Sequence, residues 1–250
     1  MQNLRRIAFF WKGQDTSFPT ILVLSIRRTF GSDIEVVQLS DPDTPEVEGV
    51  SRCQRMKLSP LMMVARLEAY RSLAISEPTL FLDADMMVVK PFDLPALQAN
   101  EIGVTPRDER VEINWRAPIE FPEFKGKYFC DEMPYIYSFI YTSTPELFAR
   151  QLDQLRKLPR RFQEWYGDQV TLKHELDSQQ RFIRRDFDVR IYNRAVQSVG
   201  EFNVVLGTEL DVCIVHFKGP RGKIMLEAVM RFLRGAPAGR RSPAGIRLQK

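Results

Sequence analysis

Residues 80–89, with the sequence LFLDADMMVV, place two carboxylates inside an apolar run. We expect this run to be a buried strand that carries Asp83 and Asp85. Side chains two residues apart on a strand lie on the same face, so the two carboxylates can converge on one ion. An unpartnered buried charge is costly, and carboxylate oxygens suit Mg²⁺ or Mn²⁺, which commonly bridge to phosphate. The segment therefore predicts a metal site that holds a phosphorylated substrate.

The composition of the chain sets its broad class. The 250 residues are 44% hydrophobic and 27% charged, as in an ordinary soluble globular protein. No apolar run reaches the roughly 20 residues that span a membrane, and the N-terminus does not resemble a secretory signal. Three cysteines, Cys53, Cys130 and Cys213, lack CxxC spacing, which argues against a disulfide framework or a zinc site. We therefore expect a cytoplasmic protein.

The net charge of +4 lies in residues 235–250, which contain four Lys and Arg and no acid. The remaining 32 Lys and Arg balance the 32 Asp and Glu. A nucleic-acid-binding domain more often carries a basic face across its fold, so we expect no nucleic-acid partner. Residues 235–250 are rich in Gly, Pro and Ala, which predicts a disordered basic tail after a single catalytic domain at residues 1–234.

Strand and helix patterns alternate along the chain. Strands are predicted, besides the acid-bearing one, at Leu4–Phe10, Ile34–Leu39, Glu101–Thr105, Tyr135–Tyr141 and Asp211–Phe217. Helices are predicted at Pro19–Arg28, Pro60–Ser72, Leu147–Leu158 and Ile224–Leu233. This alternation predicts an α/β fold with a mostly parallel central sheet and helices on both faces. Residues 108–128 are expected to form a long loop or lid, and the aromatic residues of 135–141 to lie on one buried strand face.

Two further motifs carry polar chemistry. Residues 215–223, VHFKGPRGK, end a strand at His216, a competent Mn²⁺ ligand, and continue into a glycine-rich loop. The cations of that loop, Lys218, Arg221 and Lys223, could each neutralise a diphosphate. Residues 165–170, WYGDQV, place Asp168 and Gln169 before a helix, where both can hydrogen-bond sugar hydroxyls.

Each of these motifs also has a structural interpretation. Asp168 could simply cap the helix that follows it. Arg66, in the helix before the acid-bearing strand, could lie on a solvated helix face. The other histidine of the chain, His174, is assigned a structural role.

In combination these motifs resemble the glycogenin and bacterial lipopolysaccharide galactosyltransferase family, which are retaining glycosyltransferases with the Rossmann-like GT-A fold. The resemblance rests on Arg66, the LDAD sequence at 82–85, the DQ sequence at 168–169 and the HFxG pattern at 216–219. They occur in the family's order and cover about residues 4–225. Two departures stand out: Gly222 occupies the place of the family's lysine, and residues 136–138 (IYS) replace its NAG sequence.

The resemblance implies a role for each residue. Asp83, Asp85 and His216 would coordinate the divalent ion, Mn²⁺ in preference to Mg²⁺. Asp168 would bind donor-sugar hydroxyls and Gln169 would lie near the anomeric carbon. The nucleotide and donor would be bound by Phe9, Phe10, Trp11, Arg66, Asp83, Ala84, Asp85, Lys218, Gly219 and Lys223.

The predicted function is metal-dependent transfer of a sugar from a nucleotide-diphosphate donor, with a UDP-sugar favoured, to a glycan, lipid-linked or other acceptor. Retention of configuration is implied by the resemblance alone. One alternative is a haloacid-dehalogenase-type phosphatase, although Met87 stands where that class usually has Thr or Val. Another is a catalytically silent sugar-nucleotide-binding protein. The C-terminal segment has two interpretations. Either the last helix packs on the core and the tail lies in solvent, or helix and tail lie peripherally on the acidic inner membrane surface.

Overall fold

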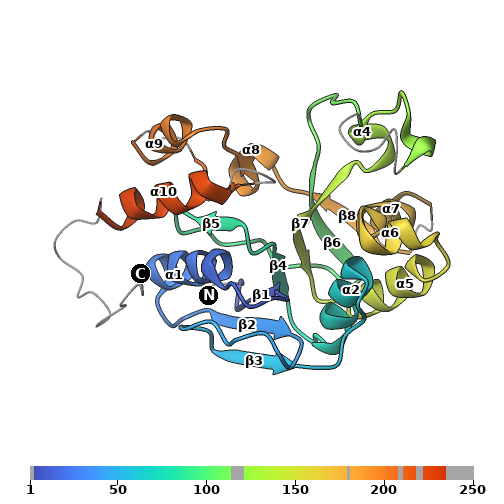
Figure 1. Cartoon of the computed structure of the whole chain (residues 1–250), viewed down its shortest axis with the longest axis horizontal. Helices are drawn as coiled ribbons and strands as arrows, with labels where there is room; N and C mark the ends of the chain where they lie inside the picture. Colours follow the sequence, from blue (N-terminus) through green and yellow to red (C-terminus); the bar gives the residue numbers. More distant parts are fainter. Residues whose placement is uncertain (1–2, 114–120, 179–180, 208–210, 218–221, 235–250) are drawn as a thin grey trace.

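A computed structural model describes residues 3–113, 121–178, 181–207, 211–217 and 222–234 (Figure 1). The described strands are β1 (Arg6–Phe10), β2 (Glu35–Ser40), β3 (Arg52–Arg55), β4 (Thr79–Leu82), β5 (Met86–Val88), β6 (Glu101–Pro106), β7 (Tyr135–Thr142), β8 (Ile183–Asp186), β9 (Arg194–Ala195) and β10 (Ile214–His216). The α-helices are α1 (Ser17–Phe30), α2 (Met62–Ser72), α4 (Phe129–Glu132), α5 (Glu146–Leu155), α6 (Arg160–Glu164), α7 (Gly167–Lys173), α8 (Val189–Tyr192), α9 (Val199–Gly207) and α10 (Gly222–Arg234). A 3-10 turn at Pro122–Phe124 and a π-helical turn at His174–Ser178 complete the set.

Seven of the described strands form the central sheet, in the order β3-β2-β1-β4-β7-β6-β8. β7 is antiparallel to both of its neighbours, and the other adjacent pairs are parallel. The prediction of a mostly parallel sheet is therefore confirmed. The strands β5, β10 and β9 form a second, smaller sheet beside it.

The side chains of β1 show how both faces of the central sheet are covered. Ala8 and Phe10 pack in one apolar cluster with residues of α2 and α5, whereas Ile7 and Phe9 pack in another with residues of α1. Successive side chains of a strand point to opposite faces, so β1 contributes to both clusters. Figure 1 shows α1 on one side of the sheet and α2 and α5 on the other, as the sequence predicts.

β7 changes faces partway along its length. Its register against β6 shifts between Val104 and Thr105. Tyr137 packs in the α2–α5 cluster, whereas Phe139, two residues later, packs in the α1 cluster. The prediction of one aromatic face is therefore wrong, because a bulge adds residues to one strand and turns its side chains. The residue at the turn is Ser138, whose side chain reaches the site described below.

The acid-bearing strand is in fact two strands. β4 ends at Leu82 and β5 begins at Met86, and residues 83–85 form a turn between them. Asp83 and Asp85 are thus brought together by a turn rather than by strand periodicity. The last strand, Ile214–His216, is shorter than the predicted Asp211–Phe217.

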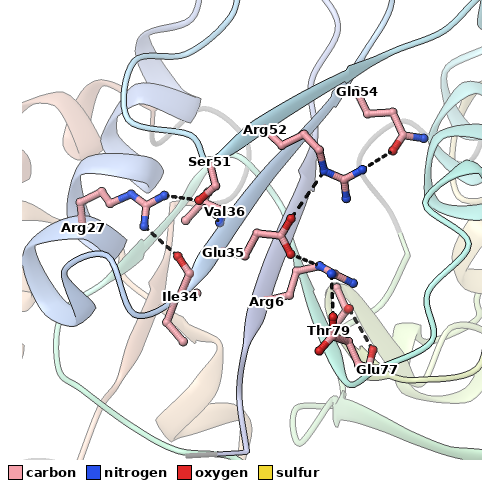
Figure 2. Close-up of polar contacts among 10 residues, drawn as sticks. All are labelled: Arg6, Arg27, Ile34, Glu35, Val36, Ser51, Arg52, Gln54, Glu77 and Thr79. Atoms are coloured by element: carbon pink, nitrogen blue, oxygen red, sulfur yellow. Dashed lines mark hydrogen bonds and ion pairs between the residues drawn. The ribbon is translucent and has the colours of Figure 1, made fainter.

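Charged side chains join the strands at the amino ends of the sheet, which is the end opposite to residues 83–85. Arg6 contacts Glu35 at 2.5 Å and Glu77 at 2.7 Å, and Arg52 contacts Glu35 at 3.5 Å (Figure 2). Ion pairs near the surface contribute about 0–1 kcal/mol each. The apolar clusters therefore supply most of the stability of the fold, and these pairs supplement it.

The C-terminal helix α10 packs on the core. Met225, Ala228 and Phe232 are buried in a cluster with Val215 and Phe217. These three side chains are therefore covered by the core, and Val229 of the same face is partly buried against them, which favours the core-packed interpretation of this helix. Among the described residues, no helix is both long and apolar enough to cross a bilayer. The predicted basic tail, 235–250, lies outside the described residues.

Gly167, at the start of α7, occupies a position with no room for a side chain. A Cβ there would lie 2.2 Å from the carbonyl oxygen of Phe162 and 2.3 Å from Cδ1 of Leu155. We expect Gly167→Ala to lower the free energy of unfolding by about 3 kcal/mol, because backbone atoms must move apart. As a control, the Cβ of Gly200→Ala would lie 3.6 Å from Oγ of Ser198. This variant should keep its stability or gain up to about 1 kcal/mol. Urea denaturation measures both, and wild-type stability of Gly167→Ala would contradict the expectation.

Candidate active site

Three side chains converge at the carboxyl end of β4. Ligand atoms of Asp83, Asp85 and His216 all lie within 4.8 Å of one another. Two carboxylates and an imidazole are a donor set that suits Mn²⁺, which accepts both oxygen and nitrogen ligands. The residues present therefore fit a divalent cation, and the juxtaposition that the sequence predicts for these three side chains is observed.

The pairing of β5 with β10 brings His216 to the two acids. The strands are antiparallel, with His216 opposite Met86, the residue after Asp85. The backbone N–H of Phe217 donates to the carbonyl oxygen of Asp85 at 3.0 Å, which extends the ladder by one bond. As a result Nε2 of His216 lies 3.3 Å from Oδ1 of Asp85.

A buried polar network holds the imidazole of His216 from behind. Nδ1 of His216 lies 2.9 Å from Oδ1 of Asn193, and Nδ2 of Asn193 donates to Thr105 Oγ1 at 2.8 Å and to Ser138 Oγ at 2.9 Å. These four side chains are all buried. With Nδ1 donating to Asn193, Nε2 is directed toward the carboxylates, and in the neutral imidazole its lone pair is the one available to a metal ion.

The electrostatics of Asp85 favour its charged form. Burial alone would raise the pKa of this carboxyl group, but a protonated His216 imidazole, which without a cation donates from Nε2 to Asp85, and the Arg66 guanidinium hold the pKa below its ordinary value. Asp85 is therefore ionised at neutral pH and able to ligate a cation.

Arg66 joins Asp83, in the turn after β4, to Asp168 of α7. Its Nη1 donates to Oδ2 of Asp168 at 2.8 Å, and its Nη2 lies 3.4 Å from Oδ1 of Asp83. Burial alone would lower the pKa of Arg66, but these two carboxylates raise it above its ordinary value, so the guanidinium stays charged. The interpretation of Arg66 as a solvated surface residue is wrong.

Asp168 uses one carboxylate oxygen for Arg66 and the other for the first turn of its own helix. It lies in the first turn of α7, whose N-cap is Tyr166. Tyr166 adopts a left-handed conformation, with φ of 66°, which is uncommon for a bulky residue. This turn, together with the close approach at Gly167, directs Asp168 and Gln169 into the site. Asp168 is thus not the N-cap residue, but its Oδ1 also accepts from the backbone N–H of Gln169 at 2.8 Å, so it stabilises the first turn of α7 as well as pairing with Arg66.

Gln169 is held by an arginine that the sequence did not single out. Nη2 of Arg107 donates to Oε1 of Gln169 at 2.7 Å. An arginine can only donate hydrogen bonds, so the amide oxygen of Gln169 faces Arg107 and its NH₂ group faces away from it. Burial lowers the pKa of Arg107 to about 10, which leaves it charged at neutral pH.

Most of these residues line one cleft of about 1110 Å³, among them the three acids, His216 and both arginines. Its walls include Phe10, Trp11 and Ala84, which the sequence assigns to donor binding. Phe9 is different: its side chain is fully buried in the α1 cluster and does not line the cleft. The prediction that the Phe9 side chain contacts the nucleotide is therefore not met, because alternation along β1 turns it to the other face of the sheet.

The predicted diphosphate contacts lie mostly outside the described residues. Lys218, Gly219 and Arg221 fall in the gap at 218–221, and the side chain of Lys223 is not described either. Their roles stay predictions.

Sequence reasoning missed two residues of the site. Asn193 precedes the two-residue strand β9 and carries no motif, so its place behind His216 follows only from the pairing of β9 with β10. Arg107 directly follows β6, which was predicted. Its position after a sheet strand was the available signal, because functional side chains gather at strand ends in open α/β sheets.

Comparison with known proteins identifies the fold. The solved galactosyltransferase LgtC, in complex with donor and acceptor sugar analogues, matches with a TM-score of 0.53 and 12% identity over 90% of this chain and 95% of that one. An active-site mutant of LgtC matches with a TM-score of 0.56 and 12% identity over the same shares of the two chains. A glycosyltransferase involved in glycosylation of the major capsid of PBCV-1 matches with a TM-score of 0.55 and 13% identity, over 91% of this chain and 99% of that one. No protein-family model and no curated sequence matches significantly. The chain has the GT-A fold of these enzymes.

We expect Asn193→Ala to weaken Mn²⁺ binding by about 10- to 100-fold, since loss of the partner behind a ligating histidine typically costs that much affinity. Electron paramagnetic resonance of free Mn²⁺ measures the affinity, and circular dichroism verifies the fold. Asn3→Ala, at an exposed site near the N-terminus, is the control. Unchanged Mn²⁺ affinity in folded Asn193→Ala would show that this network does not position His216.

Proposed function

We propose that this protein is a metal-dependent glycosyltransferase that moves a sugar from a nucleotide-diphosphate donor, with UDP-sugars favoured, to a glycan or other acceptor. The observation that carries the proposal is the convergence of Asp83, Asp85 and His216 within 4.8 Å, at a large cleft in a GT-A fold. Both the donor set and the position at the carboxyl ends of the sheet strands agree with a bound metal–diphosphate.

The proposed roles begin with the three metal ligands. Asp83, Asp85 and His216 would hold a divalent cation, with Mn²⁺ favoured because one of the ligands is an imidazole. When bound, such a cation stabilises the negative charge that develops on a departing diphosphate. The Asn193 network keeps His216 in the orientation that this role requires.

Asp168 and Gln169 are the proposed donor-sugar contacts. Both line the cleft. Arg66 holds the buried carboxylate of Asp168 in place, and Arg107 fixes the amide of Gln169 so that its NH₂ group can donate to a ligand. These two residues would orient the sugar before the bond to the diphosphate breaks, an effect of positioning rather than of acid–base chemistry.

The nucleotide base is proposed to lie against Phe10 and Trp11, at the end of β1. Trp11 is half-buried, and its indole N–H donates to the carbonyl oxygen of Asp15 at 2.9 Å, which fixes the ring. A fixed aromatic ring offers a flat surface on which a base can stack. The cations of 218–223 would neutralise the diphosphate.

The direct test is sugar transfer from a panel of UDP-sugars to sugar acceptors, with and without Mn²⁺, in wild type and in Asp85→Asn. We expect Asp85→Asn to lower Mn²⁺-dependent turnover by roughly 100-fold or more, because a lost metal ligand removes several kcal/mol of charge stabilisation. Asp33→Asn, which changes an exposed acid after α1, is the matched control and should keep wild-type turnover.

Three results would count against the proposal. Full activity of Asp85→Asn would show that Asp85 is not a metal ligand needed for transfer. Rapid hydrolysis of p-nitrophenyl phosphate would favour the phosphatase. Mn²⁺-dependent binding of UDP without any product would favour a silent binding protein.

A further inference from the structure

Arg107 and Arg66 line the same cleft but differ in their partners. Arg66 is neutralised by two carboxylates, at 2.8 and 3.4 Å. Arg107 makes no ion pair with any described residue. Its side chain donates from Nε to the carbonyl oxygen of Met133 at 2.8 Å and from Nη2 to the amide oxygen of Gln169 at 2.7 Å. Both of these acceptors are uncharged.

The remaining donors of Arg107 are available to a ligand. A guanidinium has five N–H groups, and the two bonds above use one on Nε and one on Nη2. Both N–H groups of Nη1 and the second one of Nη2 have no acceptor among the described residues. The plane of the guanidinium is also held, because it lies over the ring of Phe129 with its central carbon 4.9 Å from the ring centroid. A fixed and partly desolvated guanidinium with free donors is suited to a planar anion.

The surroundings of Arg107 suit a sugar with a single negative charge. Trp165 lines the cleft with 48% of its surface exposed. Its ring centroid lies 5.9 Å from that of Tyr166, and the ring centroid of Tyr166 lies 6.0 Å from that of Phe129. An exposed aromatic ring offers an apolar face to the C–H groups of a sugar. Asp108 and Glu109 also line the cleft next to Arg107, so a dianionic phosphate would meet like charges.

We propose that Arg107 binds a carboxylate carried by a sugar substrate, and so makes this protein selective for uronic-acid sugars over their neutral counterparts. The proposal rests on the proposed function, since it assigns a substrate class to that same cleft. Gln169 also lines the cleft, and its NH₂ group, which faces away from Arg107, can donate to another group of the same sugar. The carboxylate can belong to the donor sugar or to the acceptor sugar, because both meet at the reacting centre.

The test compares acidic and neutral sugars in two arms. In the donor arm, calorimetry with Mn²⁺ measures the affinity of UDP-glucuronate against UDP-glucose and of UDP-galacturonate against UDP-galactose, with UDP alone as reference. In the acceptor arm, with UDP and Mn²⁺ saturating, saturation-transfer NMR measures methyl glucuronide against methyl glucoside and methyl galacturonide against methyl galactoside. Each arm is run on wild type, Arg107→Met, Arg107→Lys and Arg110→Met. Arg110 is an exposed arginine on the same segment, 69% accessible and paired with Asp131, which makes it the matched control.

We expect wild type to prefer the acidic sugar by at least about tenfold in one of the two arms, as expected for a charged hydrogen-bonded contact. Arg107→Met should lose this preference while still binding UDP, Arg107→Lys should keep part of it, and Arg110→Met should keep all of it. If Arg107 had a purely structural role, Arg107→Met would weaken the binding of acidic and neutral sugars alike. The ratio of the affinity for the acidic sugar to that for its neutral counterpart therefore separates the two roles.

The outcomes also separate this inference from the proposed function. Mn²⁺-dependent UDP binding with no acidic preference in either arm, or with a preference that Arg107→Met retains, overturns the carboxylate site and leaves the transferase proposal standing. No UDP binding, together with an Arg107-dependent preference for methyl glucuronide or methyl galacturonide, supports the carboxylate site and counts against the transferase.

Discussion

The antiparallel pairing of β10 with β5 is the constraint on which the site depends. Asp83 and Asp85 are separated by one residue and meet in a local turn, but His216 arrives from near the end of the described chain. Its position is set by backbone hydrogen bonds on both sides of the pair, from Val89 N to Cys213 O at 2.8 Å and from Phe217 N to Asp85 O at 3.0 Å. Because these bonds specify a register, the imidazole meets the carboxylates without relying on a flexible loop.

Buried charge organises the remainder of the cleft. The side chain of Asp168 is almost completely buried and that of Arg66 is largely buried. Burying either charge without the other would cost several kcal/mol, on the order typical of an unpaired buried ion. Together with Asp83 they form a chain of opposite charges that links β4 to α7. Arg107 departs from this pattern because its protein partners are neutral. Donors left free on the wall of a cleft in this way are where ligands are expected, because most buried polar groups in folded proteins are paired.

The bulge in β7 connects the core to the site. Without it, Tyr135 to Tyr141 would alternate regularly and Ser138 would point into one of the apolar clusters. The register shift instead turns Ser138 toward Asn193, within the network behind His216. Here the departure from regular strand geometry supplies a polar group at a buried position, in keeping with the occurrence of bulges near functional sites.

The order of the main elements, and which side chains converge as a candidate metal site, could be predicted from the sequence alone. Hydrophobic periodicity and the acids inside an apolar run are local signals, so both can be read from neighbouring residues. Three features became visible only in the folded chain: the turn at 83–85, the position of Phe10 on the cleft side of the sheet with Phe9 on the other side, and the partners of His216, Arg66 and Gln169. These follow from strand register, a bulge and contacts between distant segments, and such pairings have no counterpart in the local pattern of any single segment.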